Sequence, residues 1–139
     1  MPGITLLGLG PGDPAQLSRE AWDTLSSSPE VWLRTRQHPT LAGFPAGLTV
    51  HSFDALYENG TAFEEVYASI VEQILDLGRR KNGVVYAVPG DPYIAEATSP
   101  EIARRARELG IPVRVISGIS FLEPVFSALG LDPFPRLTL

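Results

Sequence analysis

The tetrapeptide Pro-Gly-Asp-Pro occurs twice in this chain, around Asp13 and around Asp91, and each copy places a carboxylate on a glycine turn. An apolar run precedes each copy, Ile4 to Gly8 before the first and Val84 to Val88 before the second. Such runs are typical of buried strands, and the strand-to-helix turns of a parallel sheet gather at its carboxyl edge, where ligands bind. A loop that binds phosphates keeps carboxylates away from the oxyanions, so both aspartates favour a neutral or cationic ligand.

A third loop, Ser117 to Leu122, follows another strand-like run with small residues at the start of a helix. Its backbone amides and the Ser120 hydroxyl can bind a ligand carboxylate or a ribose hydroxyl. Each loop also has a purely structural interpretation, because Asp13 can cap a helix, Asp91 can belong to an ordinary Pro-Gly turn, and Ser120 can open a capping box. We expect the three loops to converge on one pocket that does not favour phosphate.

The first loop also invites comparison with the dinucleotide-binding pattern G-x-G-x-x-G, but Asp13 stands where the third glycine belongs. No acidic residue ends the second expected strand to bind a ribose, and Arg34 and Arg36 lie there instead. A P-loop is excluded because no Gly-Lys-Ser/Thr follows. Either arginine can bind a 2′-phosphate, so a dinucleotide-dependent reductase stays an alternative.

Composition narrows the function classes further. A chain of 139 residues is one domain, and its 44% hydrophobic content indicates a soluble globular protein. The formal net charge of -5 argues against non-specific nucleic-acid binding, and no apolar run is long enough to span a membrane. The absence of cysteine excludes thiolate catalysis and suits a cytoplasmic location. His38 and His51, the only histidines, are too few for a metal site, and we interpret them as surface residues.

Strand-like and helix-like patterns alternate along the chain, which predicts an α/β fold with three layers: a mostly parallel five-stranded sheet with helices on both faces. The expected strands are 4–8, 31–33, 48–50, 84–88 and 111–116. Helices are expected after the Asp13 cap, from a Thr61–Glu64 capping box to Gly78, from Ser99 to Gly110, and from Ser120 to Gly130. The core is expected to take both tryptophans and the periodic residues Leu17, Ala21, Leu25, Phe63, Val66, Tyr67, Ile70, Ile74 and Leu77.

The last residues, Leu137 to Leu139, look like the opening of another strand. A frayed terminus is the simpler interpretation. We prefer the alternative that residues 1–139 are the amino-terminal α/β domain of a larger protein.

Taken together, the three loops resemble those of the tetrapyrrole (corrin/porphyrin) methylases, the class III S-adenosylmethionine-dependent methyltransferases. That family has a G-x-G-x-G-D loop after its first strand, a G-D-P loop after its fourth and a P-G-I-S-S-like loop after its fifth. Here the loops are Gly8 to Asp13, Gly90 to Pro92 and Ser117 to Ser120. This chain departs from the pattern where Ser117 replaces the usual proline and Phe121 replaces the usual second small residue.

Four segments carry a narrower resemblance, to the methylase-like domain that is fused to MazG-type nucleotide pyrophosphohydrolases. They are 34–39, 53–58, 85–90 and 120–123. The likeness covers the whole chain but only the amino-terminal half of a methylase module. It implies a second α/β domain and a fused MazG-like region outside this chain, and a homodimer by analogy with the family.

The family resemblance also implies roles for individual residues. S-adenosylmethionine is expected to lie between the two domains, against Gly90, Asp91, Ile94, Ile119, Ser120 and Phe121. Pro11, Gly12 and Asp13 are expected on the side of the methyl acceptor, a small molecule that is tetrapyrrole-like only by family label. The sequence assigns no catalytic residue, and this does not count against methyl transfer, because orientation and exclusion of water can supply much of its catalysis. The alternative is a non-catalytic methylase-like module that regulates or docks a fused MazG-type nucleoside triphosphate pyrophosphohydrolase.

Overall fold

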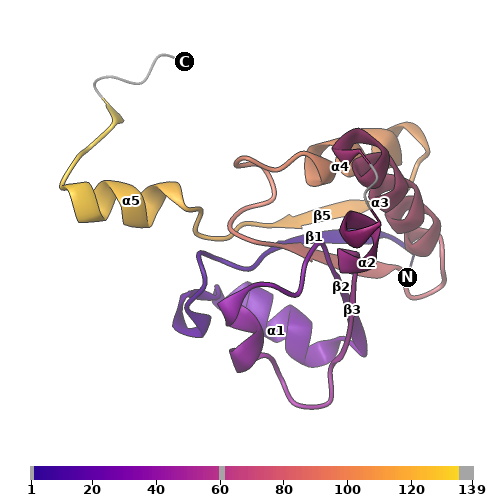
Figure 1. Ribbon diagram of the computed structural model, residues 1–139. Coiled ribbons are helices and arrows are strands. Elements are labelled where there is room, and N and C mark those ends of the chain that lie inside the picture. Colours follow the sequence, from indigo (N-terminus) through magenta and orange to yellow (C-terminus); the bar gives the residue numbers. More distant parts are fainter. Residues whose placement is uncertain (1, 60–61, 135–139) are drawn as a thin grey trace.

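The computed structural model describes residues 2–59 and 62–134, in which a five-stranded sheet lies between two layers of helices (Figure 1). The strands are β1 (Ile4–Gly8), β2 (Glu30–Leu33), β3 (Thr49–Ser52), β4 (Val84–Val88) and β5 (Val113–Ile116). Their order across the sheet is β3-β2-β4-β1-β5, and every neighbouring pair is parallel. The predicted α/β fold is therefore confirmed, and β1 and β4, which precede the two copies of the repeated tetrapeptide, pair directly.

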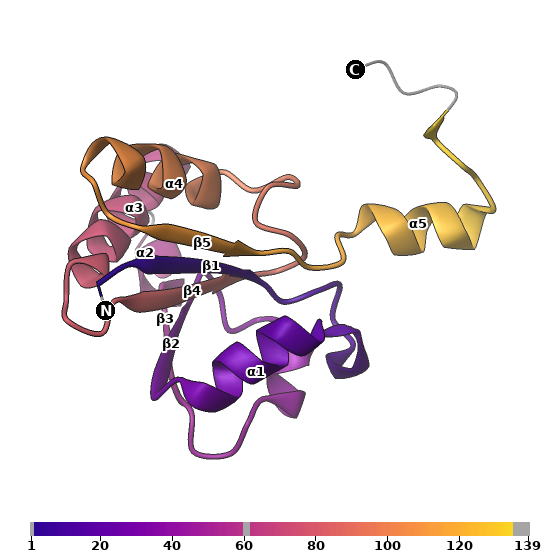
Figure 2. The same ribbon diagram turned by 180° about the vertical axis from the view of Figure 1, so that it is seen from behind.

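Helices cover both faces of this sheet (Figures 1 and 2). The helical segments are η1 (Pro14–Gln16), α1 (Arg19–Ser27), η2 (Pro39–Gly43), α2 (Asp54–Glu58), α3 (Phe63–Gly78), α4 (Thr98–Glu108) and α5 (Leu122–Leu129). α3 and α4 pack on one face, where Leu6 of β1 points, and α1 packs on the other, where Leu7 points. Burial on both faces explains why the strands are continuous apolar runs rather than alternating ones. α5 follows β5 and projects away from the sheet in both views.

The first helix begins later than expected. Asp13 caps only the single turn of η1, where its carboxylate accepts a hydrogen bond from the backbone N–H of Ala15 at 2.9 Å. α1 starts after Ser18, whose hydroxyl accepts a hydrogen bond from the N–H of Ala21 at 3.0 Å. The buried stripe of α1 is Ala21 and Leu25, and Trp22, one position round the helix, is 43% exposed. The prediction that Trp22 lies in the core is wrong.

α3 follows its predicted face in part. Val66, Ile70 and Ile74 are buried as expected, whereas Phe63 is 66% exposed because it begins the helix, one turn before the buried stretch. The spacing also missed Val71 and Leu75, which are buried as well. The expected cap at Thr61 and the expected strand at 137–139 lie outside the described residues.

Two smaller expectations have clear outcomes. Trp32 is partly buried and stacks on the ring of His51, with centroids 4.3 Å apart. Among the helices of the described residues, none combines the length and the apolar character that crossing a membrane requires.

Candidate functional site

Three loops meet at the carboxyl edge of the sheet, where β1, β4 and β5 end. The backbones of Gly10 and Gly90 exchange two hydrogen bonds, with N···O distances of 3.1 and 2.9 Å. The third loop packs against this pair so closely that a Cβ on Gly118 would lie 2.2 Å from the carbonyl oxygen of Gly90. The three loops therefore converge as expected. Glycine is needed at position 118 because any side chain there would overlap the backbone of Gly90.

The carboxylate of Asp91 joins two of these loops. One oxygen accepts a hydrogen bond from the backbone N–H of Gly118 at 3.0 Å, and the other accepts one from the N–H of Tyr93 at 2.9 Å. Asp13, in the first copy of the tetrapeptide, is exposed and serves η1. The two aspartates therefore have different structural roles despite identical neighbours in sequence.

A hollow of about 270 Å³ opens between the three loops and the segment after β2; we call it the carboxyl-edge hollow. It is lined by Gly10, Pro11, Arg34, His38, Pro89, Gly90, Ile94, Ala95, Glu96, Ser120 and Phe121. Of the predicted cofactor residues, four line it: Gly90, Ile94, Ser120 and Phe121. Pro11 is the member of the predicted acceptor side that lines it. Asp91 is not part of the lining, but its hydrogen bond to Gly118 holds two of the surrounding loops together. Gly12, Asp13 and Ile119 also lie outside the lining.

Arg34 and Glu96 form an ion pair in this hollow that the sequence prediction missed. The guanidinium Nη1 of Arg34 lies 3.3 Å from the carboxylate of Glu96, whose side chain is only 2% exposed. Glu96 also accepts hydrogen bonds from the backbone N–H and the hydroxyl of Thr98, at the first turn of α4. Because the two charges compensate each other, the described lining of the hollow offers no surplus arginine or lysine to a phosphate, which fits a neutral ligand or a sulfonium.

His38 also lines the hollow, although the sequence prediction treated it as a surface residue. Burial is the largest influence on its imidazole and lowers its pKa, and the positive charge of Arg34 lowers it further. The backbone carbonyl of Gly10 acts in the opposite sense and raises this pKa. One signal in the sequence pointed here: Arg34 and His38 follow β2, and residues that follow a parallel strand lie at its carboxyl edge.

The third loop uses its serine locally. The Ser120 hydroxyl accepts a hydrogen bond from the backbone N–H of Leu122 at 3.1 Å and bonds the carboxylate of Glu123. This hydrogen bond holds the pKa of Glu123 below its usual range. The expected capping box is not formed as predicted, because the residue at the N-cap of α5 is Phe121, which makes no side-chain capping hydrogen bond, and Ser120 and Glu123 bond each other through their side chains. α5 ends at Gly130, whose φ of 66° is the left-handed conformation typical of helix ends.

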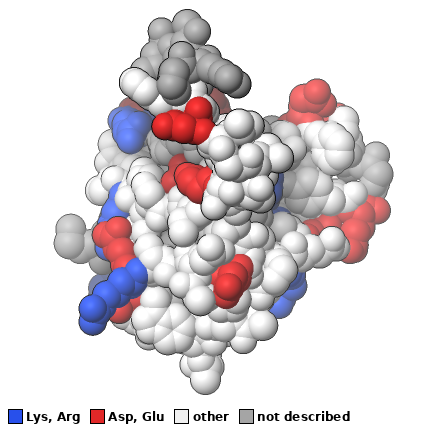
Figure 3. Space-filling view, turned by 90° about the vertical axis from the view of Figure 1, so that its left-hand side faces the viewer, with Lys and Arg blue, Asp and Glu red and all other residues white. Residues whose placement is uncertain are grey.

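An apolar surface adjoins the hollow along α5. No residue of α5 is buried, and two apolar side chains stand out: Phe121 is 53% exposed and Leu129 is 63% exposed. Other exposed apolar residues on the second and third loops and along α5 are Tyr93, Ile94, Ile119, Val125, Leu131 and Phe134. Figure 3 shows mostly uncharged atoms on this face, interrupted by several acidic side chains, with lysine and arginine side chains toward its margins. Apolar surface of this extent on a folded chain marks an interface or a binding site.

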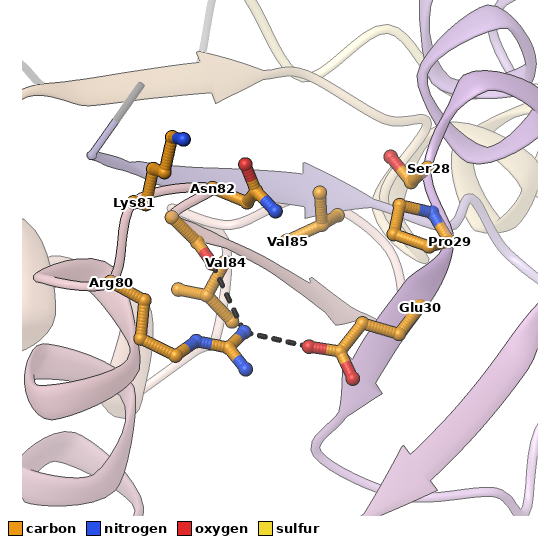
Figure 4. A pocket seen from close by; sticks show the side chains of 9 residues that line it. Ser28, Pro29, Glu30, Arg80, Lys81, Asn82, Val84 and Val85 are labelled. Atoms are coloured by element: carbon orange, nitrogen blue, oxygen red, sulfur yellow. Dashed lines mark hydrogen bonds and ion pairs between the residues drawn. The ribbon is translucent and has the colours of Figure 1, made fainter.

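A second hollow of about 270 Å³ lies at the amino edge of the sheet, beside Glu30 and Arg80 (Figure 4). Two of its charged groups, Glu30 and Arg80, bind each other, and Lys81 also lines it. Arg80 donates to Glu30 at 2.6 Å and to the carbonyl of Gly83 at 3.0 Å. Glu30 also lies 2.9 Å from the imidazole of His51. The Arg80 bond is the main reason why the pKa of Glu30 lies below its usual range. Since these groups are engaged and the hollow lies away from the strand ends that bind ligands, the carboxyl-edge hollow is the better candidate.

The parallel sheet, the glycine loops at its carboxyl edge and the exposed helix beyond them define an α/β domain of the methylase kind. The family profile described as Tetrapyrrole (Corrin/Porphyrin) Methylases matches residues 3–134, so the chain belongs to this family.

Individual relatives agree with this assignment. The protein YabN of Bacillus subtilis, whose function is uncharacterised, is 36% identical over 131 residues, which are 94% of this chain and 27% of YabN. A crystal structure of uroporphyrin-III-C-methyltransferase from Thermus thermophilus superposes with a TM-score of 0.67 at 26% identity, over 94% of this chain and 54% of that one. A uroporphyrin-III C-methyltransferase from the same organism, complexed with S-adenyl homocysteine, shows the same fold at 24% identity and a TM-score of 0.59, over 94% and 52%. The chain thus spans about half of these solved enzymes and about a quarter of YabN.

Proposed function

We propose that this chain is the cofactor-binding part of an S-adenosylmethionine-dependent methyltransferase, with the cofactor at the carboxyl-edge hollow. The observation that carries the proposal is the meeting of three glycine loops around a hollow whose charged groups, Arg34 and Glu96, neutralise each other. Such a hollow suits a sulfonium compound without phosphates better than a nucleotide. Family membership and the complex of a structural neighbour with S-adenyl homocysteine support the same ligand.

The cofactor side of the hollow is proposed to consist of Gly90, Asp91, Ile94, Ile119, Ser120 and Phe121. Four of these line the hollow, and Asp91 fixes the second loop to the third. The acceptor side is proposed to be the first loop, through Pro11 and the backbone of Gly12 and Asp13, because the Asp13 carboxylate is used as a cap. The methyl acceptor is proposed to be a small molecule.

A second α/β domain is proposed to complete the cleft, with the apolar face of α5 packed in the full protein. The chain spans about half the length of its solved relatives, and α5 buries no residue within this chain. We further propose, by family analogy, a homodimer.

Calorimetry with S-adenosylhomocysteine tests the proposal. The full-length protein is expected to bind it, and the 139-residue chain is expected to bind more weakly, because part of the cleft is missing. NADPH is the control, since the rival reductase needs a free arginine, whereas Arg34 pairs with Glu96 and the Arg36 guanidinium donates to the carbonyl of Val50. Absence of S-adenosylhomocysteine binding to the full-length protein at millimolar ligand contradicts the proposal, and NADPH binding favours the rival.

One observation favours a second function, a non-catalytic module that regulates a fused MazG-type pyrophosphohydrolase. The Ser120 hydroxyl, which a ligand would need, is already bonded within the third loop, and the bulky Phe121 stands beside it. Comparison of pyrophosphohydrolase activity with and without residues 1–139 separates the two functions. A regulatory module changes that activity, whereas an independent methyltransferase leaves it unaltered.

A further inference from the structure

His38 is the one imidazole among the residues that line the carboxyl-edge hollow. It shares this hollow with Gly10 and Pro11 of the first loop and with Gly90 and Ser120 of the second and third loops. Its ring is therefore placed where the proposed acceptor side and the proposed cofactor side meet.

The segment that carries His38 is packed against the first loop rather than free. Thr40 is fully buried, and its hydroxyl donates to the carbonyl of Leu9 at 3.4 Å. Pro39 lies 3.7 Å from the position that a Cβ on Gly12 would take. The turns η1 and η2 also pack against each other. These contacts hold the backbone that directly follows His38, which helps to keep its side chain at a defined place.

The protonation state of His38 suits the acceptance of a proton. Its Nδ1 is buried and has no hydrogen-bond partner among residues 2–59 and 62–134, so Nε2 is the nitrogen that a ligand in the hollow can reach. Burial and the charge of Arg34 hold the pKa of the imidazole below its usual value, so the ring is neutral at neutral pH and keeps a nitrogen lone pair. Of the charged residues that line the hollow with it, Glu96 pairs with Arg34, and Arg34 is a cation that donates protons and cannot accept one; its Nε is buried without a partner among the described residues.

The carboxylates of the adjoining loops are occupied as well. Asp13 binds the N–H of Ala15, and Asp91 binds those of Tyr93 and Gly118. Each carboxylate thus serves the backbone around it, and the imidazole is the group in the hollow that is suited to receive a proton.

On the basis of the proposed methyl transfer, we infer that His38 is the general base that removes a proton from the methyl acceptor. The acceptor is then a protic nucleophile, with a hydroxyl, an N–H or an acidic C–H at the reacting atom. Bound S-adenosylmethionine supplies the methyl group, since its S–CH3 bond breaks with the electron pair passing to sulfur while the bond from the acceptor atom to that carbon forms. His38 receives the proton of the acceptor atom, so the positive charge lost from the sulfonium appears on the imidazolium. The backbone carbonyl of Gly10 favours this charge, whereas Arg34 opposes it.

Nuclear magnetic resonance of the two histidines tests this inference without the unknown acceptor. The imidazole signals of the 139-residue chain are followed from about pH 5 to about pH 8, and a His51→Gln variant assigns them. His38 is expected to titrate below about 6.5 in the free chain. Saturating S-adenosylmethionine is expected to lower the pH midpoint of the His38 titration by roughly a further half pH unit, because the positive sulfonium repels the imidazolium. S-adenosylhomocysteine, which lacks that charge, serves as the matched ligand and is expected to have a smaller effect.

The outcomes separate this inference from the proposed function. The backbone amides of Gly90 and Ser120 report whether the ligand enters the hollow. If they shift with S-adenosylmethionine while the His38 midpoint stays where it is, the role of His38 is wrong and cofactor binding stands. If neither ligand shifts these amides, the titration is repeated on the full-length protein, and absence of a shift there shows that both are wrong. His51, on β3 and bonded to Glu30, is the internal control and is expected to be unaffected by either ligand.

Discussion

The carboxylate of Asp91 accepts a hydrogen bond from the backbone N–H of Gly118 at 3.0 Å, across 27 positions of sequence. This contact ties the loop after β4 to the loop after β5, and these strands are separated in the sheet by β1. The shape of the carboxyl-edge hollow therefore depends on the Asp91 side chain, although Asp91 does not line the hollow. Asp13, in the first copy of the same tetrapeptide, makes no such link and caps the turn beside it.

Asp91→Asn is expected to loosen the hollow. An amide keeps one acceptor oxygen but turns an NH2 group toward the other backbone N–H, so one of the two bonds is lost. We expect a loss of about 1–2 kcal/mol in the free energy of unfolding and a roughly tenfold weaker affinity for S-adenosylhomocysteine. Urea denaturation and calorimetry measure the two effects. Asp13→Asn is the matched control for stability and is expected to change it by less than about 0.5 kcal/mol, because asparagine caps helices as well as aspartate does. Equal losses in the two variants would contradict the bridging role.

Gly118→Ala is expected to separate the loops by steric conflict. Its Cβ would lie 2.2 Å from the carbonyl oxygen of Gly90, and backbone that is hydrogen-bonded on both sides cannot move away freely. We expect a loss of about 2 kcal/mol or more in the free energy of unfolding. Gly47→Ala is the comparison, since Gly47 has a φ of 82° but open space around it. It should lose only about 1 kcal/mol, from backbone strain. A Gly118 variant as stable as the Gly47 variant argues against close packing of the loops.

Arg34→Met is expected to leave the carboxylate of Glu96 buried without its partner. Loss of one member of a buried ion pair costs about 3–5 kcal/mol, and the partial exposure of Arg34 places the expected loss near the lower figure. Adding Glu96→Gln removes the unpaired buried charge and is expected to recover part of the lost stability. Urea denaturation of the two single variants and the double variant measures this as a double-mutant cycle. Arg104→Met, which breaks exposed pairs with Glu101 and Glu108, is expected to leave the denaturation midpoint unchanged. A double variant less stable than Arg34→Met would show that the pair is not coupled in this way.

The pair of Glu30 and Arg80 is expected to make stability depend on acid. The pKa of Glu30 is lowered in the folded chain, so its contribution is present at neutral pH and is lost as the pH falls through the folded pKa. Arg80→Met is therefore expected to reduce stability at neutral pH, by less than about 1 kcal/mol, and the difference from the natural chain should shrink below about pH 4. Urea denaturation at several pH values measures it. If the difference in free energy of unfolding between the two chains grew as the pH fell, the prediction would be wrong.

Local patterns in the sequence were sufficient for much of the fold. The apolar runs before Asp13 and Asp91 predicted β1 and β4, and the helical spacing of Val66, Ile70 and Ile74 predicted the buried face of α3. Trp22 and Phe63 were misplaced because periodicity indicates which residues share a face but not where the helix begins or where the sheet beneath it ends.

The candidate site, like the fold, was predicted from the sequence only in part. The three loops contain glycine directly after strands, and two of them also contain aspartate. This pattern predicted that the site lies at the carboxyl edge of the sheet and that its ligand carries no phosphate. The sequence distinguished the two aspartates only in part: it predicted that Asp13 can cap a helical turn, as it does, but it did not predict that Asp91 links two loops. Asp91 differs from Asp13 because the sheet brings the N–H of Gly118 within reach of it.

Amino-acid type and spacing therefore determined by themselves the alternation of strands and helices, the parallel sheet and the family. Only the tertiary structure paired Arg34 with Glu96, turned His38 toward the same hollow and left α5 uncovered. The physical reason is that strand and turn propensities act over a few neighbouring residues, whereas the charge balance and protonation of a site depend on groups that the strand order brings together from distant parts of the chain.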